Sequence, residues 1–146
     1  MIFAYNHIMK YIVYSFLFIS LFACTKRTKY DNKYLDNVSF SKDINLDLPE
    51  YSSLRYANNS VLVYNIGIKG VIVFYSGSAY FAWEASDPNH YPSACSQMQP
   101  NQFTCECDCE ANQYSLYTGQ ITKGSGDYSL KPYHVSLSGT ILHISN

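Results

Sequence analysis

The apolar residues of this 146-residue chain come in short runs, and this feature limits its fold more than any other. The runs at 61–66, 70–75 and 79–84 are rich in Val, Ile, Tyr and Phe, and glycine or polar residues separate them. β-Branched and aromatic residues in short runs between turn residues are typical of strands. No segment shows the apolar period of an amphipathic helix. The sequence therefore predicts an all-β domain built from many short strands.

Further strands follow from alternation of apolar and polar residues. Ile44, Leu46 and Leu48 alternate with polar residues until Pro49, which has no N–H to donate to a strand partner. The other predicted strands are 103–109, 114–117, 132–137 and 140–144. The last two flank Ser138-Gly139, which fits a two-residue hairpin turn.

The N-terminus has the features of an export signal. Lys10 precedes an uncharged apolar stretch over residues 11–23, which is short for a membrane-spanning helix and typical of a signal peptide. The residues Leu21-Phe22-Ala23-Cys24 resemble the bacterial lipobox, in which cleavage before the cysteine is followed by its acylation. This resemblance predicts lipidation at Cys24, with translation starting at Met1 or Met9. A plain signal peptide or an N-terminal anchor helix is the alternative.

These features predict three parts: a signal peptide (1–23), a lipidated tether (24–36) and a β domain (37–146). The protein is then a lipoprotein of the cell envelope, facing the periplasm or held in the outer membrane, whose membrane contact is the lipid anchor. A net charge of −1 gives no basic face, so nucleic acid is excluded as a partner. Besides Cys24 the chain has four cysteines, and an even number in an oxidising compartment favours disulfides.

The order of motifs around the cysteines carries a family resemblance. Phe81-Ala82-Trp83-Glu84 leads into a polar loop, 107–114 forms a second loop after an alternating strand, and Gly119 and 130–135 follow. This arrangement resembles the Rieske ferredoxin domain over residues 60–146. The resemblance implies an antiparallel β-sandwich or barrel of short strands, with two loops that hold a [2Fe–2S] cluster in the family.

The cluster positions of the family are degenerate in this chain. A Rieske centre binds one iron through two thiolates and the other through two imidazoles. In the matching positions the chain has Asp87, Asn89, Cys107 and Glu110, with His90 one residue late. Carboxylate oxygens at Asp87 and Glu110 are the wrong donors for an iron–sulfur cluster. We therefore expect no cofactor; the alternative is a [2Fe–2S] cluster or other metal held by a non-standard set including His90 and Cys107.

Some Rieske domains carry a disulfide between the two loops, and the resemblance places Cys95 and Cys109 at its positions. The residues themselves leave the pairing of Cys95, Cys105, Cys107 and Cys109 open. A bridge from Cys105 to Cys107 would need a bend, because residues two apart in a strand lie near the upper distance for a disulfide. These four cysteines with His90 also have enough donors for zinc, although Cys-x-Cys-x-Cys on one strand does not converge on one ion without a sharp turn.

The other residues that could bind or react are expected to have structural roles or to be solvated. Trp83, His134 and His143 are expected in the core or on strand surfaces, and an acidic edge of Glu106, Asp108 and Glu110 is expected to be solvated. No catalytic order of nucleophile, base and acid is present, so no enzyme is predicted. The sequence predicts a cluster-free structural or binding module with an unidentified envelope protein as partner. The alternative is a ferredoxin-type electron carrier.

Overall fold

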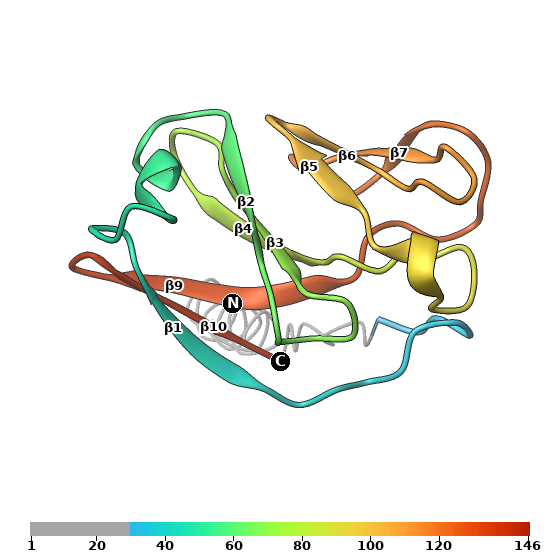
Figure 1. Cartoon of the computed structure of the whole chain (residues 1–146), viewed down its shortest axis with the longest axis horizontal. Helices are drawn as coiled ribbons and strands as arrows, with labels where there is room; N and C mark the ends of the chain where they lie inside the picture. The colour runs from blue at the N-terminus through green and yellow to red at the C-terminus, as the bar shows by residue number, and fades with distance from the viewer. Residues whose placement is uncertain (1–29) are drawn as a thin grey trace, which may run out of the picture.

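The computed structural model describes residues 30–146, which form two antiparallel sheets (Figure 1). The signal peptide, Cys24 and the first part of the predicted tether lie outside the described residues. The larger sheet has the strand order β1-β10-β9-β4-β3-β2, and the smaller has the order β5-β6-β7-β8. The strands are β1 (Ser41–Asn45), β2 (Asn59–Val63), β3 (Val71–Tyr75), β4 (Tyr80–Glu84), β5 (Gln99–Asn101), β6 (Thr104–Glu106), β7 (Gln113–Ser115), β8 (Ile121–Lys123), β9 (Pro132–Ser138) and β10 (Ile141–Ser145).

Strand β3 lies at the centre of the core because both of its faces are covered. Ile72 and Phe74 belong to an apolar cluster shared with the smaller sheet, while Val71 and Val73 belong to a second cluster shared with β1 and β10. All four side chains have no exposed surface. A strand covered on both faces needs apolar residues at every position, and this explains the uninterrupted run Val71-Ile72-Val73-Phe74.

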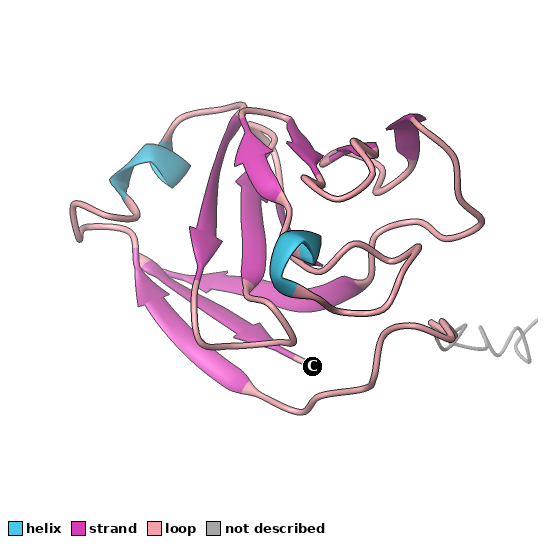
Figure 2. Ribbon diagram, turned by 45° about the vertical axis from the view of Figure 1, so that its right-hand side comes forward, coloured by secondary structure: helices cyan, strands magenta, loops and turns pink. Residues whose placement is uncertain are grey.

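The all-β prediction is confirmed, with differences at the ends of several elements. Two short 3₁₀ helices, η1 (Ser52–Arg55) and η2 (Ala94–Ser96), are present in the described residues (Figure 2). Strands β5 and β8 were not predicted. The first predicted strand ends at Asn45 rather than at Pro49, and the final hairpin turns at Gly139-Thr140, one residue later than expected.

The alternating segment 103–109 is not one strand. Only Thr104–Glu106 pairs as β6, and the chain then turns, with the Ala111 N–H donating to the Cys107 carbonyl at 2.9 Å. Ala111 has a left-handed φ of 54°. The turn removes the side-by-side arrangement of Cys105, Cys107 and Cys109 that an extended strand would have imposed.

The domain's contacts begin before residue 37. The Tyr30 hydroxyl donates to the Ser129 carbonyl at 2.6 Å, and Nδ2 of Asn32 donates to the Pro88 carbonyl at 2.8 Å. Leu35 is buried. In Figure 1 this first described segment, in blue, runs below the end of the molecule that carries η2. Within residues 30–146, no helix has the length and apolar character needed to cross a membrane.

The carboxylate of Glu84 fixes the turn between β2 and β3. It is fully buried and accepts hydrogen bonds from the backbone N–H groups of Ile68 and Lys69 at 2.8 and 2.9 Å and from the Tyr133 hydroxyl at 2.7 Å. Gly67 lies against it with a φ of 68°, and a Cβ there would be 2.6 Å from Oε2 of Glu84. The turn therefore requires glycine both for its backbone conformation and for space.

Candidate functional site

A disulfide joins the two loops at one end of the molecule. The first loop runs from β4 to η2, and the second connects β6 to β7. Cys95, in η2, is bonded to Cys109, in the second loop, with a Cα–Cα distance of 5.2 Å. The predicted disulfide between the loops is confirmed. Cys105 and Cys107 are both free and buried, so the even cysteine count does not become two disulfides.

The first loop is built around the buried carboxylate of Asp87. Its Oδ1 accepts hydrogen bonds from the Tyr114 hydroxyl and the Asn89 N–H, each at 2.8 Å. Its Oδ2 accepts from Nδ2 of Asn112 at 3.4 Å and lies 3.9 Å from Nε2 of His90. Burial raises the pKa of Tyr114, so its hydroxyl keeps its proton and donates to Asp87. Asp87 therefore acts as an acceptor that holds both loops together.

Asn89 connects the first loop to the segment that follows β8. Its Nδ2 donates to the Tyr114 hydroxyl and to the Tyr128 carbonyl, each at 2.9 Å, and its Oδ1 accepts from the Tyr128 N–H at 3.0 Å. A Cβ at Gly126 would lie 2.2 Å from the Asn89 side chain. Asn89 thus has its amide fully used inside the protein and is not aimed at a ligand.

His90 and Cys107 are in direct contact between the loops. Nε2 of His90 is 3.3 Å from Sγ of Cys107, and Nδ1 is 2.9 Å from the Tyr91 carbonyl oxygen. Since a carbonyl only accepts, Nδ1 carries the proton and Nε2 presents its lone pair to the Cys107 thiol. The side-chain donor atoms of His90, Cys107 and Cys109 all lie within 4.8 Å of one another.

The thiol of Cys107 is held in its neutral form. Burial raises the pKa of Cys107 to about 11, and Asp87 acts in the same direction. The backbone N–H groups of Cys109 and Glu110 oppose this by favouring the thiolate. Burial also raises the pKa of Cys105, whose sulfur packs 3.7 Å from Sδ of Met98 inside the apolar core. Cys105 is a core residue and no part of the site.

The residues present do not fit a Rieske centre. In that centre imidazoles and thiolates bind different irons, so the cluster separates them. Here His90 and Cys107 touch at 3.3 Å, and two of the matching positions supply the carboxylates of Asp87 and Glu110. The carboxylate of Asp87 is occupied by hydrogen bonds from protein groups. The donors that a diiron cluster needs are therefore either replaced by carboxylates or too close together.

The other predicted site residues lie apart from this contact. Glu110 is exposed, and its Oε2 accepts from Nδ2 of Asn112 at 3.3 Å, so it does not replace an imidazole in the site. The five-ligand zinc set does not assemble, because Cys105 lies in the core beside Met98. The remaining members of the acidic edge, Glu106 and Asp108, are exposed.

The predicted structural residues occupy ordinary positions. Nε1 of Trp83 donates to the Leu116 carbonyl at 2.9 Å inside the core. His134 is exposed, and Nδ1 of His143 lies 2.6 Å from Asp43 on the surface of the larger sheet. The sequence indicated no role in the site for Tyr114 or Asn112, and it singled out Asn89 only as a cluster-loop position. No sequence pattern marks the contacts of Asp87 with Asn112 and Tyr114, because these residues lie 25 and 27 positions away from it.

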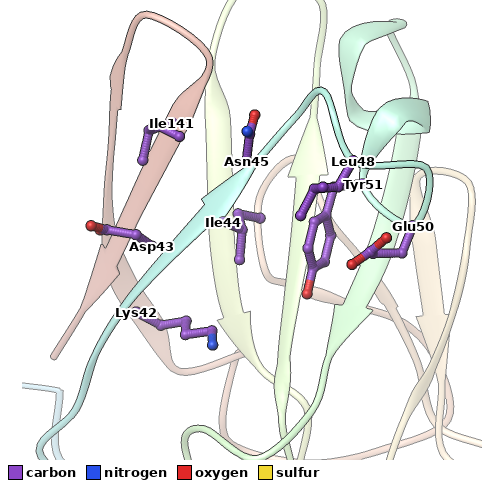
Figure 3. A pocket seen from close by; sticks show the side chains of 8 residues that line it. All are labelled: Lys42, Asp43, Ile44, Asn45, Leu48, Glu50, Tyr51 and Ile141. Carbon is purple, nitrogen blue, oxygen red and sulfur yellow. The ribbon is translucent and has the colours of Figure 1, made fainter.

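A surface pocket of about 280 Å³ lies along β1, apart from the loops (Figure 3). Its lining includes Lys42, Asp43, Glu50 and Tyr51. Asp43 is engaged by His143, and the pocket has no cysteine and no histidine in its lining. The pocket therefore brings together no nucleophile and base, and the two loops joined by the Cys95–Cys109 disulfide remain the stronger candidate for a functional site.

Comparison with known proteins finds similarity among solved structures alone. No protein-family model matches the chain, and no curated protein matches it. One similar chain is from the complex of reduced oxygenase and oxidized ferredoxin in carbazole 1,9a-dioxygenase (16% identity, 61% of this chain and 82% of that chain, TM-score 0.47). Others are the Sphingomonas yanoikuyae B1 ferredoxin (15%, 62% and 88%, 0.46) and the ferredoxin of carbazole 1,9a-dioxygenase from Nocardioides aromaticivorans IC177 (14%, 61% and 86%, 0.43).

The chain is an all-β domain of two antiparallel sheets, in which a disulfide joins the two loops. What the loops of this chain can bind follows from their own side chains.

Proposed function

We propose that this protein is an envelope lipoprotein whose Rieske-like domain works without a cluster, as a structural or binding module that presents its two stapled loops to another envelope protein. The observation that carries the proposal is the direct contact between Nε2 of His90 and Sγ of Cys107. These two atoms would be on opposite irons of a Rieske centre. The loops keep a defined shape through the Cys95–Cys109 bond and the Asp87 hydrogen bonds instead.

The cluster-free state is tested by the colour, iron and thiol content of the protein. Protein purified without added metal, and the same protein after anaerobic treatment with iron and sulfide, should be colourless and contain far less than one iron per chain. Two thiols per chain should be titrated after denaturation, from Cys105 and Cys107. A brown protein with about two irons per chain would contradict the proposal and favour the electron carrier.

A variant with the family's donor set is the matched control for this experiment. Asp87→Cys, Asn89→His and Glu110→His together restore two thiolates and two imidazoles at the matching positions. If the donors alone decide the outcome, this triple variant gains visible absorption on reconstitution while the unmodified protein does not. Equal iron uptake by both proteins would refute the argument from donor type.

The membrane anchor rests on the Leu21-Phe22-Ala23-Cys24 motif. Cells supplied with a labelled fatty acid should incorporate the label into the protein, and Cys24→Ser should abolish labelling and release the protein from the membrane fraction. Cys105→Ser is the control, because that thiol is buried in the core and should leave labelling unchanged. Labelling that persists in Cys24→Ser would contradict the lipoprotein assignment.

A further inference from the structure

The two loops hold three sulfur atoms and one imidazole in a single cluster. Sγ of Cys107 is a free thiol within 4.8 Å of Sγ of Cys109, and the latter is bonded to Sγ of Cys95. A free thiol beside a disulfide is the arrangement from which thiol–disulfide exchange begins. The structural role of a loop staple does not require this extra thiol.

His90 is placed to remove the proton from Cys107. Its Nδ1–H is committed to the Tyr91 carbonyl, so the lone pair of Nε2 faces the Cys107 thiol at 3.3 Å. A nucleophile within hydrogen-bond reach of a base that a third group orients is the general pattern of an activated nucleophile. Oδ2 of Asp87, 3.9 Å from Nε2, is positioned to stabilise the imidazolium that forms.

The leaving sulfur also has a partner. The Ser93 hydroxyl oxygen lies 3.5 Å from Sγ of Cys95 and 3.5 Å from Sγ of Cys109. Cys95 lies at the exposed surface, whereas Cys109 is half-buried. A thiolate released at Cys95 would therefore be better solvated by water than one released at Cys109, and this favours Cys95 as the leaving group.

We propose that the loops carry out an internal thiol–disulfide exchange in which Cys107 attacks Cys109 and releases Cys95. The proton of Cys107 passes to His90, the Cys107–Cys109 bond forms, and the Cys95–Cys109 bond breaks. The Cys95 thiolate then takes up the proton from His90 through the solvent. One thiol and one disulfide are present before and after the step, so no oxidant or reductant is consumed.

The exchange unties the loops and moves the free thiol from a buried position to an exposed one. Before the exchange, the disulfide joins Cys95 of the first loop to Cys109 of the second loop. After the exchange, the disulfide joins Cys107 to Cys109, which both lie in the second loop, so no covalent bond connects the two loops. The exposed Cys95 thiol is then available to react with a disulfide on a partner protein. The inference rests on the proposed cluster-free state, because Cys107 must be a thiol and not an iron ligand.

The test is to trap the exposed thiol in the native protein. Full-length protein purified without reductant is incubated with a maleimide, quenched in acid, and its labelled cysteines and disulfides are mapped by mass spectrometry. The proposal predicts a maleimide on Cys95 together with a Cys107–Cys109 disulfide. Cys107→Ser should abolish labelling of Cys95, whereas Cys105→Ser should leave it unchanged. His90→Gln should slow the labelling by about a hundredfold, the usual contribution of a general base.

Each other outcome overturns the proposal. Label on Cys107 with the original bond intact would show a trapped thiol that does not exchange, and a Cys95–Cys107 product would show attack at the wrong sulfur. Labelling of Cys95 that survives Cys107→Ser would show simple reduction. Iron measured on the same sample separates the two proposals: a colourless protein without exchange refutes this one alone, and an iron-containing protein refutes both.

Discussion

The bond between Cys95 and Cys109 makes a quantitative prediction about stability. The two residues are separated by 14 positions, so the bond closes a small loop within the chain. In the chain-entropy model a cross-link of this span lowers the entropy of the unfolded chain enough to stabilise the fold by about 3 kcal/mol at 25 °C. Replacing both residues by alanine removes the bond without leaving a new unpaired thiol.

The assay is equilibrium unfolding in urea, with and without the two substitutions. We expect the free energy of unfolding to fall by about 3 kcal/mol, which corresponds to a fall in Tm of about 10–20 °C for a domain of this size. Because the effect acts through the unfolded chain, the dependence on urea should steepen while the circular dichroism of the folded protein stays the same. Cys105→Ala serves as a comparison that changes a core thiol and leaves the loop closure intact.

Two results would refute this reasoning. A loss below about 1 kcal/mol would mean that the unfolded chain keeps these two residues close together even without the bond, so that little entropy is gained when the bond is removed. A large loss with altered circular dichroism would mean that the bond shapes the folded loops themselves. Treating the unmodified protein with a dithiol reductant should reproduce the loss found for the double variant, since the same bond is removed.

Three further predictions follow from single residues. Asp87→Ala should cost about 1–3 kcal/mol in urea unfolding, because it leaves buried donors of both loops without an acceptor, and a value near zero would contradict the role given to this carboxylate. Gly67→Ala should lower the free energy of unfolding by more than about 1 kcal/mol. Gly139→Ala should lower it by less, because Gly139 also has a positive φ but a Cβ there would have no atom within 4 Å. Equal losses for the two variants would assign the effect to backbone conformation alone. Alkylation of Cys95 by iodoacetamide, which follows the exchange, should become faster as the pH rises to about 11, because the Cys107 thiolate is the attacking form and burial raises the pKa of Cys107 to about 11, while Cys105 stays unlabelled in the folded protein; a plateau near pH 8 would contradict this.

The strands that fill the core could be predicted from the sequence, and the short edge strands could not. The buried positions of β3 and β4 are apolar apart from Glu84 at the end of β4, so their runs are visible directly. β5 and β8 have three residues each and are exposed at most positions, so they show no alternation of apolar and polar residues. The segment 103–109 shows the opposite failure: its alternation is regular, but the backbone turns after β6 and places Ala111 in a left-handed conformation.

At the site, the family resemblance predicted the disulfide between Cys95 and Cys109, but the contacts between the other side chains could not be predicted from the sequence. The sequence placed His90 beside Cys107 only in the alternative of a shared metal or cluster, and it did not predict their direct contact at 3.3 Å. Asp87 was recognised as the wrong donor for iron, yet its acceptance of the Tyr114 hydroxyl depends on the pairing of β6 with β7, which brings Tyr114 opposite Cys105. Contacts made by residues distant in the chain require the three-dimensional arrangement.

The contacts of Tyr30 and Asn32 with Ser129 and Pro88 determine how far the domain can stand from a lipid at Cys24. Six peptide units separate Cys24 from Tyr30, and a fully extended chain of that length reaches about 20 Å. With Cys24 acylated as proposed, the short segment between Cys24 and Tyr30 keeps the loop end of the molecule close to the bilayer surface. A partner would then have to approach from within the plane of the membrane or from just above the lipid headgroups.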